Sequence, residues 1–379
     1  MNVWDVCLTH DAMYGGIHRS VCNFAAALDG RILSFDDGAA ERTGRGEEPP
    51  VVRVACRPRP FNRACHWVTP GMAAEAAAHV AGADLLVVHS LFRGHAPWAA
   101  RWCRRRARPW WSVPEGCLDP WVLRRNRLAK RLWLACHAGG FFGGAVTIFA
   151  TARERQKAAP IVGKERTEVI HWPVPLPDVG GREDARGSFR AAHGIPDAAR
   201  ALLVAGRLHP VKRPLETIDA FVRGAPRDAH LVIVGTEEGI TIADLEARVP
   251  ADSRDRVHVL GPLAGTHLDA AFAGSDGFIS LSFKENFGFS FAEAMAHGLP
   301  VIVSPGHDLA HDLAAQAHGF ACGWLLPDDT ATAAEAAIRE WGETPAVRLA
   351  AMGGAGRAWV DGELTFARFR DRLHALAAC

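Results

Sequence analysis

Two glutamates stand eight positions apart in the stretch SLSFKENFGFSFAEAMAHGLPVIVS, Glu285 in a predicted loop and Glu293 in a predicted helix. The apolar run GFISLS predicts the strand before them. Gly288 lets backbone pass close to a ligand, and the N–H groups of Phe289 and Ser290 would open the helix, where free donors favour a phosphate. A phosphate site with a carboxylate on each side suits a ligand that carries hydroxyl groups around a pyrophosphate. A nucleotide sugar has this form, although two glutamates at this spacing are by themselves also typical of an ordinary solvated surface.

Two basic residues follow another predicted strand, ALLVAGRL. Arg207 comes directly after the strand and Lys212 five residues later. Arginine donates forked hydrogen bonds to phosphate oxygens and lysine supplies a mobile point charge, so the pair suits a diphosphate leaving group. An exposed turn explains the same pattern when it is taken alone. We find no Asp-x-Asp element suited to holding Mg²⁺ against a diphosphate, and therefore expect no metal at this site.

The elements that carry these residues alternate regularly. In the second half, strands are predicted at ALLVAGRL, HLVIVGT, VHVLG and GFISLS, with helices between them. This alternation predicts an α/β domain with a doubly wound parallel sheet. In the first half, VWDVCLTH predicts a strand that leads through Gly15 and Gly16 into a helix, and DLLVVHS predicts a strand that ends at His89. Ligands bind at the carboxyl ends of such strands, yet a tight glycine turn and a structural histidine are the simpler alternatives.

The segment from Glu285 to Glu293, continued through EAMAHGLPVIVS, resembles the E-x7-E signature of retaining GT-B glycosyltransferases, especially family 4. The resemblance implies two Rossmann-like doubly wound domains that face each other across a cleft. It implies that Glu285 binds sugar hydroxyls and Glu293 the ribose, and that Phe287, Gly288, Phe289 and Ser290 contact the donor. The segment AGRLHPVKRP is similar to the family's element in which Arg207 and Lys212 would bind the donor pyrophosphate.

The first half carries a weaker form of the same resemblance. GGIHRSVCNFAAAL is similar to the family's glycine turn, so Gly15 and Gly16 would close over the donor phosphate, but His18 stands where many members carry an acidic residue. His89 corresponds to a strand-end histidine near the transferred sugar, and we group it with Arg207, Lys212 and Glu285 as expected catalytic residues. The loop at Gly261 would lie near the nucleobase.

Length and composition predict about two domains, since 379 residues with 49% hydrophobic content can bury large cores. We expect an acceptor-side domain over residues 1–175, a linker over 176–196 from the Pro- and Gly-rich string PVPLPDVGGREDARGSF, and a nucleotide-sugar domain over 197–360. Residues 361–379 resemble the C-terminal helix that crosses back onto the N-terminal domain in GT-B enzymes.

Charge is distributed unevenly along the chain. Residues 1–175 hold 24 Lys and Arg against 15 Asp and Glu, whereas residues 176–379 hold 19 against 27. A basic half indicates an anionic partner such as a membrane surface, lipid phosphate or nucleic acid, and charge matching between the domains is the alternative. The string PEGCLDPWVL resembles a segment of bacterial exopolysaccharide and O-antigen glycosyltransferases. The basic, Trp-flanked helix predicted over 121–133 is then either an interfacial helix or a core helix with a solvated face.

Nine cysteines at irregular spacing, with no C-x-x-C pair, indicate a reducing compartment rather than a disulfide framework or a zinc site. No apolar run is long enough to span a bilayer, and the start of the sequence lacks the pattern of a signal peptide. We expect a cytoplasmic protein, in possible peripheral contact with the inner face of the membrane.

The expected function is metal-independent, retaining transfer of a sugar from a nucleotide diphosphate donor, with GDP-mannose as the first choice. The acceptor would be a glycan or a polyprenyl-linked oligosaccharide in surface polysaccharide biosynthesis, with no cofactor and no nucleic acid partner. Two alternatives stay open: a sugar-nucleotide 2-epimerase of the same fold and a catalytically silent nucleotide-sugar-binding protein.

Overall fold

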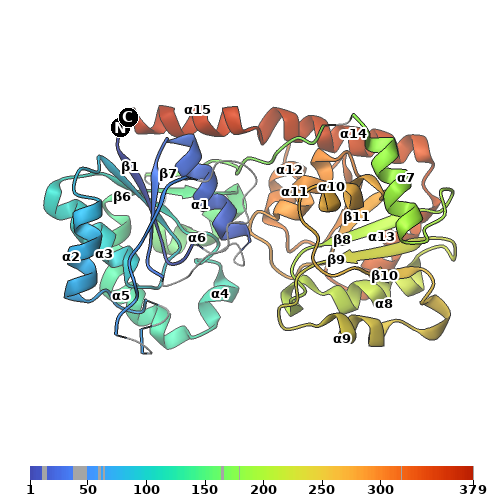
Figure 1. The fold of residues 1–379 in the computed structure, drawn as a ribbon, viewed down its shortest axis with the longest axis horizontal. Helices are drawn as coiled ribbons and strands as arrows, with labels where there is room; N and C mark the ends of the chain where they lie inside the picture. Colours follow the sequence, from blue (N-terminus) through green and yellow to red (C-terminus); the bar gives the residue numbers. More distant parts are fainter. Residues whose placement is uncertain are drawn as a thin grey trace. The chain divides into compact units, whose positions relative to one another are not determined.

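The structure is a computed structural model that describes residues 1–10, 15–36, 49–58, 61–62, 65–163, 166–178, 180–316 and 318–378. The chain forms two compact units (Figure 1). Unit 1 comprises Met1–Pro173 together with Phe366–Cys379, and unit 2 comprises Val174–Thr365. Each unit is built around its own parallel sheet.

Unit 1 holds, among its described residues, a seven-stranded sheet in the order β3-β2-β1-β4-β5-β6-β7. Every neighbouring pair in this sheet is parallel. Its strands are β1 (Val3–Cys7), β2 (Arg31–Ser34), β3 (Val51–Arg53), β4 (Leu85–His89), β5 (Trp110–Val113), β6 (Ala145–Phe149) and β7 (Thr167–Val169). Its helices are α1 (Gly16–Ala27), α2 (Pro70–His79), α3 (His95–Arg106), α4 (Pro120–Arg124), α5 (Arg127–Phe142), α6 (Ala152–Val162) and α15 (Phe366–Ala377).

The central strands of unit 1 are buried on both faces, as parallel strands covered by helices must be. All five residues of β1 and all five of β4 are buried, including Asp5 and His89. The order reverses between β1 and β4, so the carboxyl ends of these two strands form the switch point where α/β sheets bind ligands.

The last helix returns to the first unit, as the sequence predicts. Phe369 of α15 lies edge to face against Phe24 and Trp172 with ring centroids 5.0 and 6.1 Å apart, and the His374 ring lies 3.1 Å from the Ala27 carbonyl. The apolar face of α15 is therefore buried against α1.

Unit 2 holds, over its described residues, a six-stranded parallel sheet in the order β10-β9-β8-β11-β12-β13. Its strands are β8 (Ala201–Ala205), β9 (His230–Val234), β10 (Val257–Val259), β11 (Gly277–Ser280), β12 (Val301–Val303) and β13 (Gly323–Leu325). Its helices are α7 (Arg182–Ala192), α8 (Pro214–Gly224), α9 (Ile242–Arg248), α10 (Thr266–Ala273), α11 (Phe289–Ala296), α12 (Asp308–Ala314), α13 (Ala331–Glu343) and α14 (Ala346–Glu363), with the short 3₁₀ turns η2 (Pro210–Lys212) and η3 (Ala251–Ser253). This doubly wound sheet is the one that the strand and helix alternation predicts.

The segment predicted as a linker, residues 176–196, contains helix α7 and is in this respect wrong. Phe189 and Arg190 of α7 are buried, and the Arg190 guanidinium donates to the carbonyls of Gly274 and Ala199 and to the Asp276 carboxylate. The buried arginine ties α7 to the body of unit 2. The polar composition of this segment concealed the helix, because one of its two buried residues, Arg190, is charged.

The single basic helix predicted over 121–133 is also wrong, because two helices cover this region. Asp119 caps α4 as expected, accepting a 2.8 Å hydrogen bond from the Trp121 N–H. Helix α4 stops at Arg124, and Asn126 takes the left-handed conformation with φ 53° before α5 begins. Asparagine tolerates this conformation better than most residues, which allows the chain to turn here.

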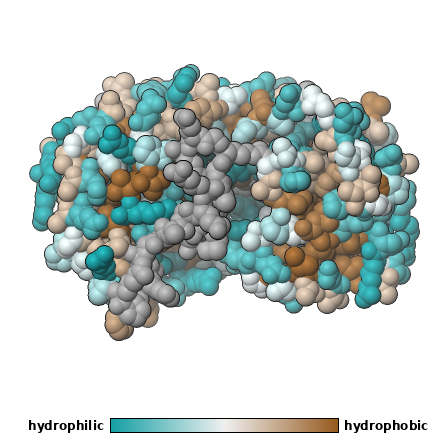
Figure 2. All heavy atoms as spheres, viewed as in Figure 1, coloured by the Kyte–Doolittle hydropathy of each residue, from teal (hydrophilic) through white to brown (hydrophobic). Residues whose placement is uncertain are grey.

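None of the helices within the described residues is both long and apolar enough to cross a bilayer. The visible surface in Figure 2 is mainly hydrophilic, with smaller hydrophobic areas on each unit. None of the eight cysteines in the described part of the chain forms a disulfide.

Candidate active site

The predicted basic and acidic residues of unit 2 gather at its switch point, where β8 and β11 lie side by side and the strand order reverses. The loop after β8 carries Arg207 and leads to Lys212 in η2. The loop after β11 carries Glu285, and the two loops are joined by a 2.8 Å hydrogen bond from the Phe283 N–H to the Val211 carbonyl. Residues 73 positions apart are thereby brought into contact.

Lys212 and Glu285 form an ion pair through Nζ and Oε2. Both side chains are partly exposed, by 24% and 20%, so that a ligand can reach them. Burial alone would raise the pKa of the Glu285 carboxyl, but positive charge around it, above all that of the Lys212 ammonium, outweighs burial and the pKa lies below its usual value. Glu285 is therefore ionised at neutral pH and ready to accept hydrogen bonds from hydroxyl groups.

Arg207 is directed elsewhere in this structure. Its guanidinium pairs with Glu238, and both side chains are 46% exposed. Exposed ion pairs of this kind contribute little stability, so a diphosphate can displace Glu238 at small cost. The structure thus places Arg207 at the same sheet edge as Lys212 but does not bring it to the Lys212–Glu285 pair.

Gly288 has the left-handed φ of 79° and caps α11. A Cβ at this position would lie 3.1 Å from the Glu285 Cγ and 3.1 Å from the His307 Nδ1. Both the backbone conformation and the lack of space therefore require glycine here. Because Gly288 has no side chain, the backbone at the start of α11 lies close to Glu285, one partner of the ion pair.

The start of α11 also lies near the end of β8. A Cβ built on Gly206 would lie 4.0 Å from the Lys212 Cε and 4.0 Å from the Ser290 Oγ. Two loops and the start of a helix therefore converge here. The Lys212 and Ser290 side chains both lie close to the backbone of Gly206. Phe287 is buried beneath Phe289, with ring centroids 5.0 Å apart, and supports the turn.

Glu293 is only partly buried, as are Phe289 and Ser290 at the start of the same helix. Its neighbours Phe291, Ala292 and Ala294 are buried, whereas Glu293 is only partly so. Its side chain therefore lies at the accessible edge of α11, one turn after Ser290, where it can reach a ligand placed at the helix start.

Gly261 follows β10 and has φ 64°. Its carbonyl accepts a 2.8 Å hydrogen bond from the Gly235 N–H, which fixes it against the loop after β9. A Cβ at Gly235 would lie 1.8 Å from the Gly206 carbonyl oxygen, so the three loops after β8, β9 and β10 pack backbone to backbone. This places Gly261 at the same edge of the sheet as Arg207, two strands away.

Sequence reasoning missed His307 and Asn286, which are the unusual groups of the site. His307 is 1% exposed, and its Nε2 lies 2.9 Å from the Ser280 Oγ. Its Nδ1 and the Asn286 Oδ1 are buried without a hydrogen-bond partner within the described structure. Buried polar atoms are rarely left so, which makes each of these two atoms a candidate for contact with a ligand. An isolated Pro-Gly-His after a strand was the only sequence signal for His307.

His307 is neutral at pH 7, because burial lowers its pKa to about 4. With its proton on Nδ1, the ring can donate to a ligand oxygen while Nε2 accepts from the Ser280 hydroxyl. The neutral ring adds a donor without adding a second buried cation beside Lys212.

One cavity of about 260 Å³ lies elsewhere in unit 2, between α8, α13 and the ends of β11 to β13. Arg213, Leu281 and Ser304 are among the residues that line it, but Arg207, Lys212 and Glu285 are not. We therefore assign the chemistry to the switch point rather than to this cavity.

In unit 1, His89 is fully buried. Its Nε2 lies 2.9 Å from the Asp5 Oδ1 and its Nδ1 lies 3.2 Å from the Glu115 Oε1. Burial opposes the charged form, but the two carboxylates outweigh it and raise the pKa of His89 to about 9. Both ring nitrogens of the imidazolium are therefore engaged by carboxylates, which does not fit the direct contact with a transferred sugar that the sequence suggested.

Asp5 and Glu115 could have been noticed in the sequence, because Asp5 interrupts an apolar strand and Glu115 lies in a Pro-Glu-Gly turn. Glu115 takes the left-handed conformation with φ 54°, as do Ser90 and Phe92 with φ 63° in the loop after β4. Such conformations cost energy in non-glycine residues and cluster at functional sites. The loops around His89 are thus strained, although His89 itself is enclosed.

Gly15 and Gly16 lie at the start of α1, next to residues 11–14, which are outside the described residues. Gly15 has φ 49° and its carbonyl accepts from the Arg19 N–H, so it serves as the first turn of α1. The expected closing of this turn over a donor phosphate stays a prediction.

Comparison with known proteins finds similarity over most of the second unit. Residues 185–359 match the family described as Glycosyl transferases group 1. A D-inositol 3-phosphate glycosyltransferase of Kineococcus radiotolerans is 30% identical over 218 residues, which is 53% of this chain and 49% of that protein. The match thus spans about half the length of this curated relative.

Solved structures extend the likeness in fold to the whole chain. The Anabaena protein Alr3699/HepE, in complex with UDP and glucose, has a TM-score of 0.79 and 17% sequence identity over 100% of both chains. WaaG, a glycosyltransferase involved in lipopolysaccharide biosynthesis, has a TM-score of 0.72 and 15% identity over 98% of both. Residues 185–359, somewhat less than half of the chain, are therefore similar to the group 1 glycosyltransferases, and the whole chain has the two-sheet GT-B fold.

Proposed function

We propose that this protein is a retaining glycosyltransferase of family 4 that moves a sugar from a nucleotide diphosphate donor without a metal ion. The observation that carries the proposal is the convergence of Lys212, Glu285 and the start of α11 around the unpartnered His307 Nδ1. An anionic group at this place meets a cation, backbone donors and a neutral imidazole, and a carboxylate stands ready for hydroxyl groups.

The reaction breaks the bond between the anomeric carbon and the diphosphate oxygen and forms a bond from that carbon to an acceptor hydroxyl oxygen. Negative charge grows on the departing diphosphate. Preorganised donors that are aimed at developing charge lower such a barrier, and we assign this role to Arg207, Lys212 and the N–H groups at Phe289 and Ser290. The acceptor proton passes to the departing phosphate on the same face, which retains the anomeric configuration.

The two carboxylates then hold the donor at either end, Glu285 at the sugar hydroxyls and Glu293 at the ribose. Binding of the donor replaces the Lys212–Glu285 and Arg207–Glu238 pairs by contacts to phosphate and sugar. Gly261 and its neighbours border the base. His89 positions the loop after β4 through Asp5 and Glu115 instead of contacting the sugar, which revises the role expected from the sequence.

Two observations bear on the base and the sugar of the donor. GDP-mannose is the choice that the sequence resemblance favours, whereas the structural neighbour Alr3699/HepE was solved with UDP and glucose. Melting temperatures measured with GDP, UDP and ADP separate these possibilities, because a nucleotide that binds the folded state raises the melting temperature. A rise with GDP alone supports GDP-mannose, and a rise with UDP alone contradicts it.

We place the acceptor among glycans or lipid-linked oligosaccharides of surface polysaccharide assembly, on the cytoplasmic side of the membrane. Leu128 and Leu132 on one face of α5 are 82% and 67% exposed, and they stand among Arg124, Arg127 and Arg131. Exposed leucines among cations suit an anionic bilayer surface. Flotation with phosphatidylglycerol vesicles should capture the protein and lose it in the Leu128→Ser, Leu132→Ser double variant, with phosphatidylcholine vesicles as the control.

The central test incubates the purified protein with radiolabelled GDP- and UDP-sugars and membrane lipid extract. Label that appears in the lipid or glycan fraction together with free nucleoside diphosphate supports transfer. Epimerised donor in the absence of acceptor would show the sugar-nucleotide epimerase instead. Nucleotide binding with neither product would leave a binding protein as the remaining function.

A further inference from the structure

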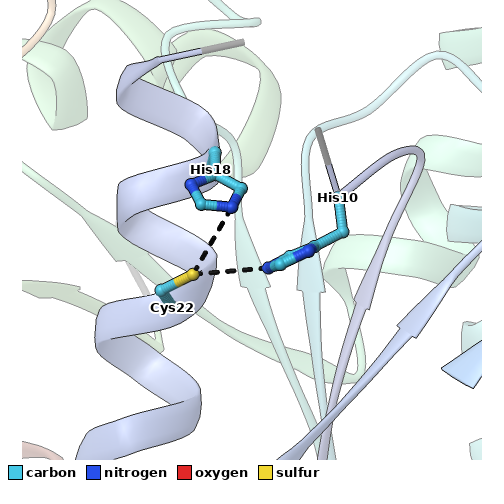
Figure 3. Close-up of side chains that lie close together, drawn as sticks. All are labelled: His10, His18 and Cys22. Carbon is cyan, nitrogen blue, oxygen red and sulfur yellow. Dashed lines mark hydrogen bonds between the residues drawn. The ribbon is translucent and has the colours of Figure 1, made fainter. Parts of the chain in front are cut away.

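A group of three metal-ligating side chains in unit 1 has no role in the proposed transfer reaction. His10 follows strand β1, and His18 and Cys22 stand four residues apart on α1. Residues at this spacing lie on the same face of a helix. Figure 3 shows both helical side chains and the His10 ring pointing toward one another.

Their ligand atoms already have the spacing of a coordination site. The Cys22 Sγ lies 3.3 Å from the His10 Nε2 and 3.8 Å from the His18 Nε2. The three atoms all lie within 4.8 Å of one another. In a tetrahedral zinc site, bonds of about 2.0 Å to nitrogen and about 2.3 Å to sulfur put these atoms about 3.6 Å apart. The two measured separations bracket that value.

Hydrogen bonds to its backbone hold His10 in place. The His10 N–H donates to the Asp36 Oδ2 at 2.8 Å, and the Arg53 guanidinium donates to the His10 carbonyl at 3.1 Å. Asp36 and Arg53 are themselves ion-paired, so both backbone polar groups of His10 are bound by one rigid unit. His10 is 2% exposed, whereas His18 and Cys22 are partly exposed. A metal ion can therefore enter from the side of α1 and meet a ligand whose backbone is anchored.

We propose that His10, His18 and Cys22 bind a zinc ion, with two imidazole nitrogens and one thiolate as ligands and a solvent-derived group as the fourth. Two nitrogens and one sulfur suit borderline-soft Zn²⁺, whereas Mg²⁺ and Ca²⁺ prefer oxygen ligands. The sequence expectation of no metal rested on the lack of a C-x-x-C pair and of a carboxylate pair. It did not consider a histidine before a helix combined with a histidine and a cysteine one turn apart within it.

The ion would link the end of β1 to the first turns of α1, and all three of its ligands belong to unit 1. Because metal binding is linked to folding, occupancy should raise the melting temperature of the protein. This readout does not depend on the proposed transferase activity, so the zinc site and that activity can fail separately.

The test uses the full-length chain after removal of metal with a chelator and dialysis. Zn²⁺ is titrated by calorimetry, and Co²⁺ serves as a spectroscopic probe because a thiolate–cobalt bond gives a charge-transfer band in the near ultraviolet. All proteins carry Cys136→Ser, which removes the one exposed thiol among the eight described cysteines, and Cys379→Ser, which removes the cysteine outside the described residues. We expect one bound Zn²⁺ per chain and a thiolate–cobalt band.

The variants assign the ligands. Cys22→Ser should remove the charge-transfer band, and His18→Asn should weaken Zn²⁺ binding by a factor on the order of 100, at least as much as the loss of a supporting group causes. Because His18 is partly exposed, we expect this second variant to stay folded. His66→Asn serves as the matched control that should bind Zn²⁺ normally. Binding that persists unchanged in both ligand variants, or the absence of zinc binding in the parent, would overturn the assignment.

Discussion

The two switch points of the molecule use charged residues in opposite ways. In unit 2, the Lys212–Glu285 and Arg207–Glu238 pairs are partly exposed, by 20% to 46% of their side chains. In unit 1, His89 and Asp5 are completely buried and Glu115 is 5% exposed. The switch point of unit 2 therefore carries ion pairs that a ligand can reach, whereas the switch point of unit 1 carries charged groups that are buried in the core.

The position of a residue at the end of a parallel strand does not by itself define a functional site. A partly exposed pair can be opened by a ligand that replaces both partners, whereas a buried pair that loses one partner leaves an uncompensated charge in the core. The unit 2 residues should therefore matter for the reaction and little for stability, and the unit 1 residues should show the reverse.

The largest expected effect is on stability, from His89→Ala. The change leaves Asp5 and Glu115 buried without their cation, and breaking such a buried arrangement costs about 3–5 kcal/mol. Urea or thermal denaturation should show this loss of stability for His89→Ala. The control is His66→Ala, which should unfold like the wild type. Among the described aromatic residues, the His66 ring contacts only Trp67, with ring centroids 6.2 Å apart. A His89→Ala protein that is stable but inactive would instead support the contact between His89 and the transferred sugar that the sequence predicts.

Lys212→Ala should reverse this pattern. Removing one group that stabilises developing charge lowers the rate by a factor of about 100 to 1,000. The melting temperature should change little, because the pair with Glu285 is partly exposed. Release of nucleoside diphosphate measures the rate, and Arg227→Ala, whose pair with Asp252 is 80% and 70% exposed, is the matched control. Equal losses in both variants would show a general charge effect rather than a site.

Gly288→Ala tests whether the start of α11 needs the left-handed turn. A left-handed residue with a Cβ costs about 1–2 kcal/mol, and here the new atom would also press on Glu285 and His307. We expect a moderate loss of stability together with a loss of nucleotide binding. In contrast, Gly354→Ala in α14, where a Cβ would meet nothing within 4 Å, should stabilise the helix by about 0.5–1 kcal/mol.

The smallest effect is a pH dependence that belongs to unit 1. His89 has a pKa of about 9 in the folded protein, above its usual 6.5. A raised histidine pKa stabilises the folded state fully below pH 6.5, and this stabilisation is lost as the pH rises to about 9. The melting-temperature difference between the wild type and Glu115→Gln should therefore narrow over this range. A constant difference would mean that Glu115 does not act through the charge on His89.

Local sequence patterns predicted most elements of both sheets. Apolar strands such as GFISLS and LLVVH, glycine turns and the Asp119–Pro120 helix start all appear where they were expected, since they depend on local periodicity and capping. Helix α7 was missed because its buried face contains Arg190, whose partners lie up to 86 residues away. The break at Asn126 was missed because a helix-compatible composition concealed one left-handed residue.

The sequence alone determined which residue types could bind a nucleotide sugar and on which strand ends they stand. Glu285, Arg207 and Lys212 follow from motif and spacing, because each stands in or beside the loop that follows a predicted strand. Tertiary structure decided which charges are available. Burial enclosed His89 between two carboxylates, left the His307 Nδ1 without a partner beside Gly288, and brought His10 to His18 and Cys22. Such effects depend on how side chains from different strands, loops and helices pack together, and sequence spacing alone does not define that packing.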